Sequence, residues 1–510
     1  MKLAIVYSRA SLGIRAPLVT VEAHISPGLP GFTIVGLPET AVKESKDRVR
    51  SAILNSDFEF PSRRITINLG PADLPKEGGR FDLPIALGIL AASKQIPNDA
   101  LAEYEFVGEL ALSGELRPIY GILPVALNAR LANRTLIVPE KNADEAVLPG
   151  DNRVLSAPHL LAVSAHLKRQ KILSLYCKKS MIVPNSYQTD NLSEVRGQMH
   201  AKRALEITAA GGHALLMVGP PGTGKTMLAS RLPSILPPLS TDEALEVVAI
   251  HSLLPQQTPI TNWTLSRPFR APHHTASAVA LVGGGSYPKP GEISLAHNGV
   301  LFLDELPEFD KRVLEVLREP LESGTILISR AARQAEFPAR FQLIAAMNPC
   351  PCGYLSDPKG RCHCTQDQVA RYRARISGPL LDRIDLQIEV PALPIEALST
   401  GRTMAEESSE TVLNRVILAV KKQHSRSSKL NARLNNREIQ TFCALKPNAQ
   451  TFIDQAIEKL GLSARAYHRI LRVARTIADL NNEESVEISH LSEALSFKKM
   501  SVLTSKSITA

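Results

Sequence analysis

The sequence has 510 residues, of which 44% are hydrophobic and 21% are charged, as in a globular protein of about three domains. It contains no run of about twenty apolar residues, and its N-terminus lacks the apolar segment of a signal peptide, so we expect a cytoplasmic protein without a membrane span. The net charge of +9 suits a polyanionic partner, although in a chain of this length such an excess is equally typical of a merely soluble protein.

Residues 1–170 alternate short β-like runs with helical patterns, which predicts one compact α+β domain. The expected strands and helices are 18–23, 64–69, 106–112 and 135–138, and 41–54 and 83–93. The segment 171–190 is basic and then polar, and we expect it to be a linker.

A phosphate-binding loop is predicted by the residues Gly219, Pro220, Pro221, Gly222, Thr223, Gly224, Lys225 and Thr226. They stand between the apolar run 214–218 and a helix start, so backbone N–H groups and the helix N-terminus can form an anion cradle. Lys225 can reach the β- and γ-phosphates, and the Thr226 hydroxyl can bind Mg²⁺. We therefore expect this loop to bind a nucleoside triphosphate with Mg²⁺.

A second apolar run, 299–303, ends in Asp304 and Glu305. Asp304 can hold the Mg²⁺ shell, and Glu305 can accept a proton from the water that attacks the γ-phosphate. The pattern is weak alone, but downstream of a phosphate loop it indicates nucleotide hydrolysis.

The rest of this region contains a glycine- and proline-rich excursion at 266–293, which is long for a loop inside a compact domain. A helix is expected at 311–323, followed by a hairpin from 325–330 and 335–341 with Arg330 and Arg333 at its tip. The pattern then predicts a strand at 343–348 that ends in Asn348, and helices from about 405 onwards.

Four cysteines, Cys350, Cys352, Cys362 and Cys364, lie within the segment 350–364. Four thiolates are enough for a closed tetrahedral Zn²⁺ site, although the spacing departs from the usual C-x-x-C knuckle. Reduced free thiols and a redox switch remain as alternatives. A disulfide framework is not expected in an intracellular protein.

Two stretches of the first domain, 75–81 and 108–123, resemble the proteolytic domain of Lon proteases, which has a ribosomal S5 domain 2-like fold. The catalytic serine and lysine of Lon fall on Arg80 and Leu123. A guanidinium group is no nucleophile and leucine is no base, so the resemblance implies a Lon-like scaffold without peptidase activity.

The segment 192–210 and the phosphate loop resemble oligomeric AAA+ ATPases, in which the residue matching Asn348 orients the attacking water. The segment 377–386 resembles the part of magnesium-chelatase ATPase subunits and MCM helicases that delivers an arginine finger to the neighbouring subunit. Arg383 is the best match, with Arg375 in reserve; a surface ion pair of Arg383 with Asp385 is the alternative.

The run 462–471 resembles the lid helix that carries the second sensor of AAA+ enzymes. Arg465 is the best match, and Arg469 and Arg472 stay open as candidates. A solvated helix face would also explain these arginines.

The whole arrangement resembles the ComM/YifB family, often described as magnesium-chelatase-like. The resemblance implies an α/β multidomain fold with a Lon-like domain at 1–170, an AAA+ core at 191–395 and a helical lid at 405–500. It further implies a cytoplasmic homohexamer that uses ATP and binds single-stranded and branched DNA, with recombination proteins as candidate partners and no membrane.

In this family the motor drives branch migration during natural transformation, and the tip arginines Arg330 and Arg333 would face the central pore and follow phosphates. The alternative function is a magnesium-chelatase-like or chaperone-like ATPase that remodels a protein partner.

Overall fold

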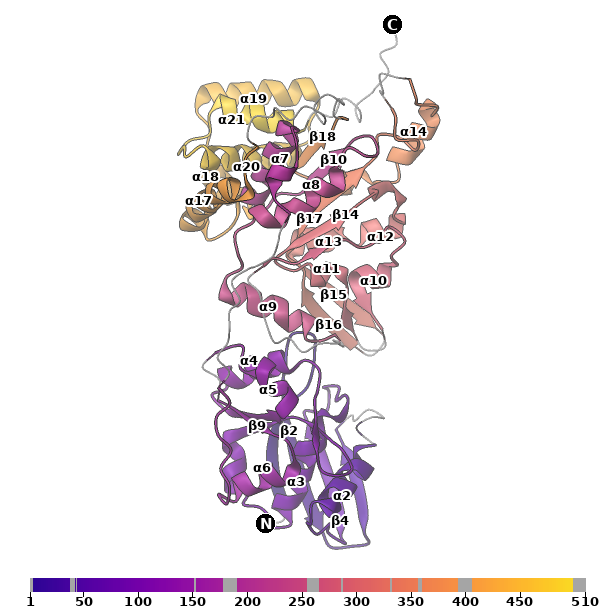
Figure 1. Ribbon diagram of the computed structural model, residues 1–510, viewed down its shortest axis with the longest axis vertical. Coiled ribbons are helices and arrows are strands. Elements are labelled where there is room, and N and C mark those ends of the chain that lie inside the picture. The colour runs from indigo at the N-terminus through magenta and orange to yellow at the C-terminus, as the bar shows by residue number, and fades with distance from the viewer. Residues whose placement is uncertain are drawn as a thin grey trace.

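The computed structural model describes residues 3–36, 42, 44–150, 153–177, 190–254, 266–285, 288–330, 333–355, 360–392 and 406–498. The N-terminal domain forms one end of an elongated molecule, a core with a parallel sheet lies in the middle, and a helical region packs beside the core at the other end (Figure 1). None of the described helices is both long and apolar enough to cross a bilayer.

The N-terminal domain is built on a mixed seven-stranded sheet with the order β3-β4-β2-β1-β5-β8-β9. The strands are β1 (Leu3–Arg9), β2 (Leu18–Ser26), β3 (Gly31–Val35), β4 (Arg64–Gly70), β5 (Tyr104–Phe106), β8 (Thr135–Pro139) and β9 (Val154–Ala157). The domain's main helices are α2 (Ser45–Asn55), α3 (Asp82–Ala92) and α6 (Leu160–Leu167). Helix α3 is buried along its whole length against β1 and β2, as its apolar sequence dictates.

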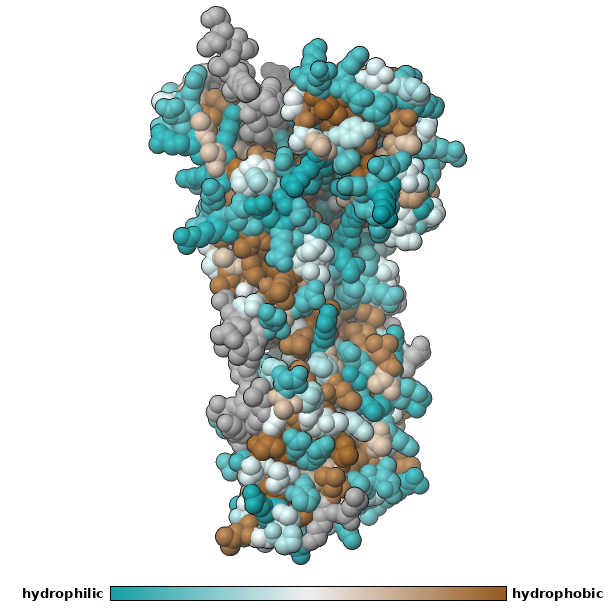
Figure 2. Space-filling view, turned by 180° about the vertical axis from the view of Figure 1, so that it is seen from behind, coloured by the Kyte–Doolittle hydropathy of each residue, from teal (hydrophilic) through white to brown (hydrophobic). Residues whose placement is uncertain are grey.

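The outward-facing positions of this sheet alternate with the core positions, so Leu3, Ile5 and Val35 are exposed. Figure 2 shows apolar and polar side chains intermixed over the N-terminal domain, at the lower end of the molecule.

The expected strand 106–112 is wrong in its extent. Strand β5 ends at Phe106, and Gly108, with φ +158°, accepts from Leu83 N and donates to Arg80 O. The chain then leaves the sheet and forms a separate pair of strands, β6 (Glu109–Leu110) and β7 (Leu116–Arg117). A glycine in an unusual conformation thus divides an apolar run that reads as continuous.

The start of the expected linker packs on the N-terminal domain. Tyr176 donates through its hydroxyl to Asp144 at 2.6 Å and through its backbone N–H to Val154 O. Residues 178–189, the greater part of that linker, lie outside the described residues.

The two positions that match the Lon dyad are both inside the protein. The Arg80 guanidinium donates to Tyr120 O at 3.2 Å, and burial lowers the pKa of Arg80 to about 10, against the raising effect of nearby Glu77. Leu123, in α4 (Ile122–Leu131), is buried in the contact with the next domain. The Lon-like interpretation of this domain stays a prediction.

The joint between the first two domains contains an apolar cluster and a backbone hydrogen bond from Gly121 N–H to Ser252 O at 3.0 Å. Helices α4 and α5 (Ala143–Ala146) meet α9 (Thr241–His251) of the core, whose start is fixed by a capping box. The buried cluster at this joint is Leu123, Leu148, Leu239, Ala244, Leu245, Val248 and Ala249. Burial raises the pKa of Glu145, at the edge of this cluster, to about 7, although the Leu123 backbone and the Ser252 hydroxyl hydrogen-bond to it and oppose the rise.

The core is a parallel five-stranded sheet with the order β11-β14-β17-β10-β18. Its strands are β10 (Leu215–Val218), β11 (Phe269–Arg270), β14 (Val300–Leu303), β17 (Gln342–Met347) and β18 (Leu386–Glu389). Its helices, besides α9, are α7 (Met199–Gly211), α8 (Lys225–Arg231), α10 (Ala278–Val282), α11 (Glu292–Leu295), α12 (Lys311–Glu315), α13 (Arg318–Ser323), α14 (Gln366–Arg373) and α15 (Gly378–Leu381). Strands buried on both faces explain the continuous apolar runs of the sequence.

Two hairpins lie outside the central sheet, and the longer one contacts the N-terminal domain, where Arg15 pairs with Glu336 at 3.1 Å. Strands β12 (Gly283–Gly284) and β13 (Lys289–Pro290) form the shorter one, and β15 (Thr325–Arg330) and β16 (Arg333–Pro338) form the longer one, in which Arg330 pairs with Arg333 along the backbone. The side chains of these two arginines and the tip between them lie outside what the structure describes.

The single helix expected at 311–323 is wrong, because the structure divides it into α12 and α13. Pro320 has no N–H to donate to the carbonyl of Val316, so the helical hydrogen-bond ladder cannot continue through this point.

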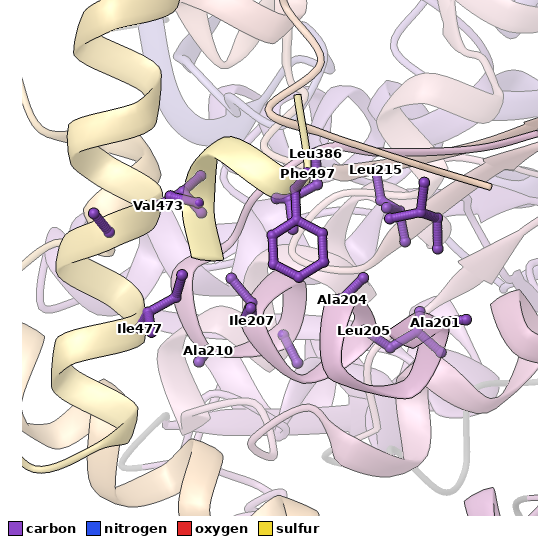
Figure 3. Close-up of a cluster of buried hydrophobic side chains, with 14 of the residues drawn as sticks. Ala201, Ala204, Leu205, Ile207, Ala210, Leu215, Leu386, Val473, Ile477 and Phe497 are labelled. Carbon is purple, nitrogen blue, oxygen red and sulfur yellow. The ribbon is translucent and has the colours of Figure 1, made fainter. Parts of the chain in front are cut away.

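The C-terminal region is helical, with α17 (Ser409–Ser427), α18 (Asn436–Phe442), α19 (Pro447–Leu460), α20 (Ala464–Leu480) and α21 (Ile488–Ser496). Its apolar side chains share one buried cluster with α7, β10 and β18 (Figure 3). In that view Phe497 lies between Ile207 of α7 and Leu386 of β18, so the helical region and the core are packed as one unit.

Candidate nucleotide-binding site

The phosphate loop follows β10 at the centre of the parallel sheet and leads into α8. A Cβ atom on Gly219 would lie 2.2 Å from Val390 O, so only glycine fits beside β18 at this point. Gly222 and Gly224 have φ values of +77° and +82°, which also favour glycine. The glycines predicted to shape the loop are therefore required by its backbone.

Lys225 is held inside this loop. Its ammonium donates to Gly219 O at 2.7 Å, to Pro220 O at 2.8 Å and to Asn348 Oδ1 at 3.2 Å. Burial lowers the pKa of Lys225, while the charges of Asp304 and Glu305 act in the opposite direction. Phosphate oxygens are charged acceptors and bind an ammonium more strongly than carbonyls do, so Lys225 can exchange these bonds for bonds to a phosphate.

Strands β14 and β17 bring the remaining polar groups to the same edge of the sheet. Because β10, β17 and β14 are parallel neighbours, Asp304 after β14 and Asn348 after β17 both lie beside the loop. Thr226 Oγ1 donates to Asp304 Oδ2 at 2.7 Å, which places a hydroxyl and a carboxylate together. Both are oxygen ligands of the kind that Mg²⁺ prefers, so this pair fits the ion.

Glu305 has an unusual backbone, with φ +50°, and its amide donates to Asp304 Oδ1 at 2.9 Å. A non-glycine residue in the left-handed region is typical of sites where the surrounding structure fixes a strained conformation. The Glu305 side chain is half exposed, and His274 Nδ1 lies 3.3 Å from its Oε2. Sequence reasoning missed this histidine, which belongs to the 266–293 excursion.

The predicted arginine finger, Arg383, makes its described contacts outside the phosphate loop of its own subunit. Arg383 donates to Pro379 O at 2.7 Å and forms an ion pair with Glu322 of α13; it does not pair with Asp385, so that alternative is wrong. Arg375, its reserve, pairs with Glu308 at 2.8 Å. Among the described residues, neither arginine has a hydrogen bond or ion pair to the phosphate loop.

The partner of Asp385 is Arg469, one of the second-sensor candidates, at 2.6 Å. Burial alone would raise the pKa of Asp385, but the hydrogen bond from His213, the charge of Arg469 and the Ala214 backbone N–H hold it well below its usual range. This buried network ties β18 to α20. Arg472 donates to Leu434 O, whereas Arg465 is exposed in the first turn of α20, and its role as second sensor stays a prediction.

The four cysteines of the 350–364 segment form a compact group. Their four sulfur atoms all lie within 4.8 Å of one another. Cys350 Sγ is 3.4 Å from Cys352 Sγ and 3.8 Å from Cys362 Sγ, and the sulfurs of Cys352 and Cys362 are 3.6 Å apart. A tetrahedral Zn²⁺ with Zn–S bonds of about 2.3 Å needs sulfurs about 3.8 Å apart, so the group fits this ion.

The cysteine group also supports the nucleotide site. A Cβ atom on Gly353, which has φ +83°, would lie 2.7 Å from Cδ of Pro221 in the phosphate loop. Arg373 donates to Pro349 O at 3.3 Å, between Asn348 and the first cysteine. The segment therefore forms a wall directly against the loop.

Three family models match the chain: "Subunit ChlI of Mg-chelatase" over residues 21–142, "Magnesium chelatase, subunit ChlI" over 191–398, and "Magnesium chelatase, subunit ChlI C-terminal" over 406–498. Competence protein ComM of Haemophilus influenzae is 54% identical over 99% of this chain and 99% of its own length. YifB of Salmonella typhimurium is 54% identical over 98% of this chain and 97% of its own. The chain belongs to the ComM/YifB family.

The similarity of this chain to a named magnesium-chelatase subunit is more limited. The 38 kDa magnesium-chelatase subunit of Cereibacter sphaeroides is 26% identical over 31% of this chain and 52% of its own length. The ComM/YifB family is thus a magnesium-chelatase-like branch of the AAA+ ATPases, and together with the phosphate loop this indicates ATP and Mg²⁺ as the ligands of the site.

Proposed function

We propose that this protein is an ATP-driven DNA motor that assembles as a homohexamer and moves branched DNA during the uptake and integration of incoming strands. The observation that supports the ATP-driven part of the proposal is that Lys225, Asp304 and Asn348 meet, with Glu305 beside them, at one edge of the core sheet. The similarity to a protein named as a competence protein supports the part of the proposal that concerns the uptake and integration of DNA.

Each residue of the site has a separate role in this proposal. Lys225 binds the phosphates, Glu305 accepts the proton of the attacking water, and Asn348 orients that water. Thr226 and Asp304 would hold Mg²⁺, which neutralises charge on the phosphates when it is bound. An arginine from a neighbouring subunit, Arg383 as the first candidate, completes the site, because the described contacts of Arg383 do not reach the loop of its own subunit.

One measurement distinguishes a DNA motor from the alternative function, a chelatase-like or chaperone-like ATPase. ATP hydrolysis is followed with single-stranded, duplex and branched DNA at fixed salt, since phosphate-mediated binding falls steeply as salt rises. A DNA motor is stimulated by DNA, most by the branched form. An ATPase whose rate is the same with and without each DNA remodels another partner.

The long hairpin is the candidate DNA contact. The double variant Arg330→Ala and Arg333→Ala should abolish branch migration. It should also make the DNA-binding constant less sensitive to salt: the slope of its logarithm against the logarithm of the salt concentration should become shallower by about one for each phosphate that is no longer neutralised. ATP binding should stay intact, because the hairpin is not part of the site. Strand-exchange assays and DNA titrations at several salt concentrations measure both effects.

The matched control is the double variant Lys421→Ala and Lys422→Ala, which removes the same charge from α17 in the helical region. Normal branch migration by the hairpin variant, or an equal loss of activity in the control, would show that the hairpin does not bind the DNA.

The cysteine group should bind one structural Zn²⁺ per chain. Replacing all four cysteines with serine should remove the metal and lower the thermal unfolding midpoint by about 5 °C or more, because binding of a structural metal contributes directly to folding. Metal analysis and calorimetry measure these effects, with Cys177→Ser, outside the group, as control. If the parent protein contains no zinc, the zinc prediction is wrong. The four cysteines are then free thiols, or a redox switch if oxidation changes the activity of the protein.

A further inference from the structure

The connection between β1 and β2 extends beyond the N-terminal sheet as a tight turn, residues 10–17, which we call the β1–β2 tip. Its two sides continue the pairing of the strands: Ala10 N–H donates to Pro17 O, and Leu12 and Arg15 exchange two backbone hydrogen bonds, each of 3.0 Å. Gly13 follows Leu12 with φ +59°, a conformation that favours glycine. The tip is therefore an ordered, hydrogen-bonded part of the fold.

The root of the β1–β2 tip is firmly anchored in the N-terminal domain. Buried Arg9, at the end of β1, forms two bonds of 2.6 and 2.7 Å with the Glu105 carboxylate of β5 and donates a third, of 2.9 Å, to Ala16 O. Ala16 itself is buried in an apolar cluster with Ile122 of α4. Helix α4 also contributes Leu123 to the joint with the core, so the tip is fixed to the same part of the domain as that joint.

The far end of the β1–β2 tip lies against the long hairpin of the core. Arg15 Nη2 donates to Glu336 Oε2 of β16 at 3.1 Å. A Cβ atom on Gly13 would lie 3.0 Å from Glu336 O and 3.5 Å from Cε1 of Phe337, so the backbone of the tip packs directly on this strand. Strand β16 lies at the end of the core that faces the N-terminal domain (Figure 1).

The long hairpin is thus held from two sides. Its core-facing side chains belong to one buried cluster and are Ile326, Ile328, Ala335 and Phe337. Glu336, at an alternate position of β16, is partly exposed on the other face, where it meets Arg15. A ribbon of two strands is only marginally stable by itself, so the orientation of the hairpin depends on the contacts on both of its faces.

We infer that the β1–β2 tip braces the long hairpin in the orientation that binds DNA, with Gly13 and Arg15 as positioning residues. A binding element that is held in place loses less conformational freedom when its ligand binds, so the brace increases the affinity for DNA. The N-terminal domain contributes in this way through the hairpin rather than through a DNA contact of Arg15. This inference rests on the proposed function, since DNA is the ligand of the hairpin.

The test makes the same substitution, Arg15→Glu, in two backgrounds of the full-length protein. In the parent it places two carboxylates together and should lower the affinity for single-stranded DNA about two- to fivefold, the effect of a partly exposed ion pair. In the Glu336→Arg background it restores an attractive pair and should raise the affinity by a similar factor, although it removes positive charge. DNA titrations at one fixed salt concentration measure both changes.

Hydrogen exchange of the backbone amides of β15 and β16 measures the brace without DNA. Exchange should be about two- to fivefold faster in Arg15→Glu and in Glu336→Arg, and should return to the parent rate in the double variant. Gly13→Asn should also speed exchange, because asparagine tolerates the left-handed conformation but adds a side chain against β16. Arg117→Glu is the matched control, since the described ion pair of Arg117 is with Glu109 of its own domain.

A loss of affinity on Arg15→Glu in both backgrounds would overturn the inference, because Arg15 would then bind DNA itself. Unchanged exchange of the hairpin amides in Arg15→Glu and Gly13→Asn, or equally faster exchange in Arg117→Glu, would overturn it as well. If the parent protein does not bind DNA, the proposed function fails, yet the exchange rates of the DNA-free variants still decide whether the β1–β2 tip braces the hairpin.

Discussion

Replacing Glu305 with glutamine should lower the rate of ATP hydrolysis by about two to four orders of magnitude, which is the usual contribution of a general base. Glutamine has nearly the same shape but cannot accept the proton of the attacking water. ATP binding should remain, because Lys225 and the loop glycines are untouched. Steady-state hydrolysis and titration with a fluorescent ATP analogue measure the two effects separately.

Glu319→Gln is the matched control for this variant. Glu319 is an exposed carboxylate of α13 on the same core, and its replacement should leave hydrolysis unchanged. If Glu305→Gln kept more than a tenth of the parent rate, another group would have to be the base.

Replacing Arg383 with alanine should lower hydrolysis by about three orders of magnitude, because an arginine finger neutralises charge that develops only in the transition state. Within its own subunit Arg383 is held by Glu322 and Pro379, so the variant acts on the neighbour's site rather than on its own. Glu322→Gln is the control: it removes the ion-pair partner but keeps the arginine, and it should retain activity.

Mixing two inactive proteins tests this arrangement directly. A subunit with Arg383→Ala still has Glu305, and a subunit with Glu305→Gln still has Arg383, so an interface between them contains one complete site. Mixed assemblies should therefore regain hydrolysis that neither variant shows alone. Mixtures that stay inactive although the two proteins co-assemble would exclude a finger supplied by the neighbour.

The sequence was most informative where function and fold need the same local pattern. The apolar runs before Gly219, Asp304 and Asn348 are found as β10, β14 and β17, because strands buried on both faces must be apolar throughout. The polar residues that follow these strands meet at one edge because parallel strands end there. This part of the site could therefore be predicted from the amino-acid sequence alone.

Other contacts around the site join residues that are distant in the sequence, so no local sequence pattern could predict them. Asp385 stands two residues after Arg383, yet its carboxylate is buried with His213 and Arg469, which are distant in the sequence. His274 reaches Glu305 only because β11 and β14 are neighbours in the sheet. The only signal for it was a pair of histidines within a long excursion, which suggested function without indicating a partner.

The apolar joint between α4, α5 and α9 gives the protein the geometry of a lever. The N-terminal domain extends from the core along the longest axis of the molecule, and the joint lies at its near end (Figure 1). If α9 rotated about the cluster around Leu123 and Leu245, the far end of the N-terminal domain would move farther than the residues at the joint.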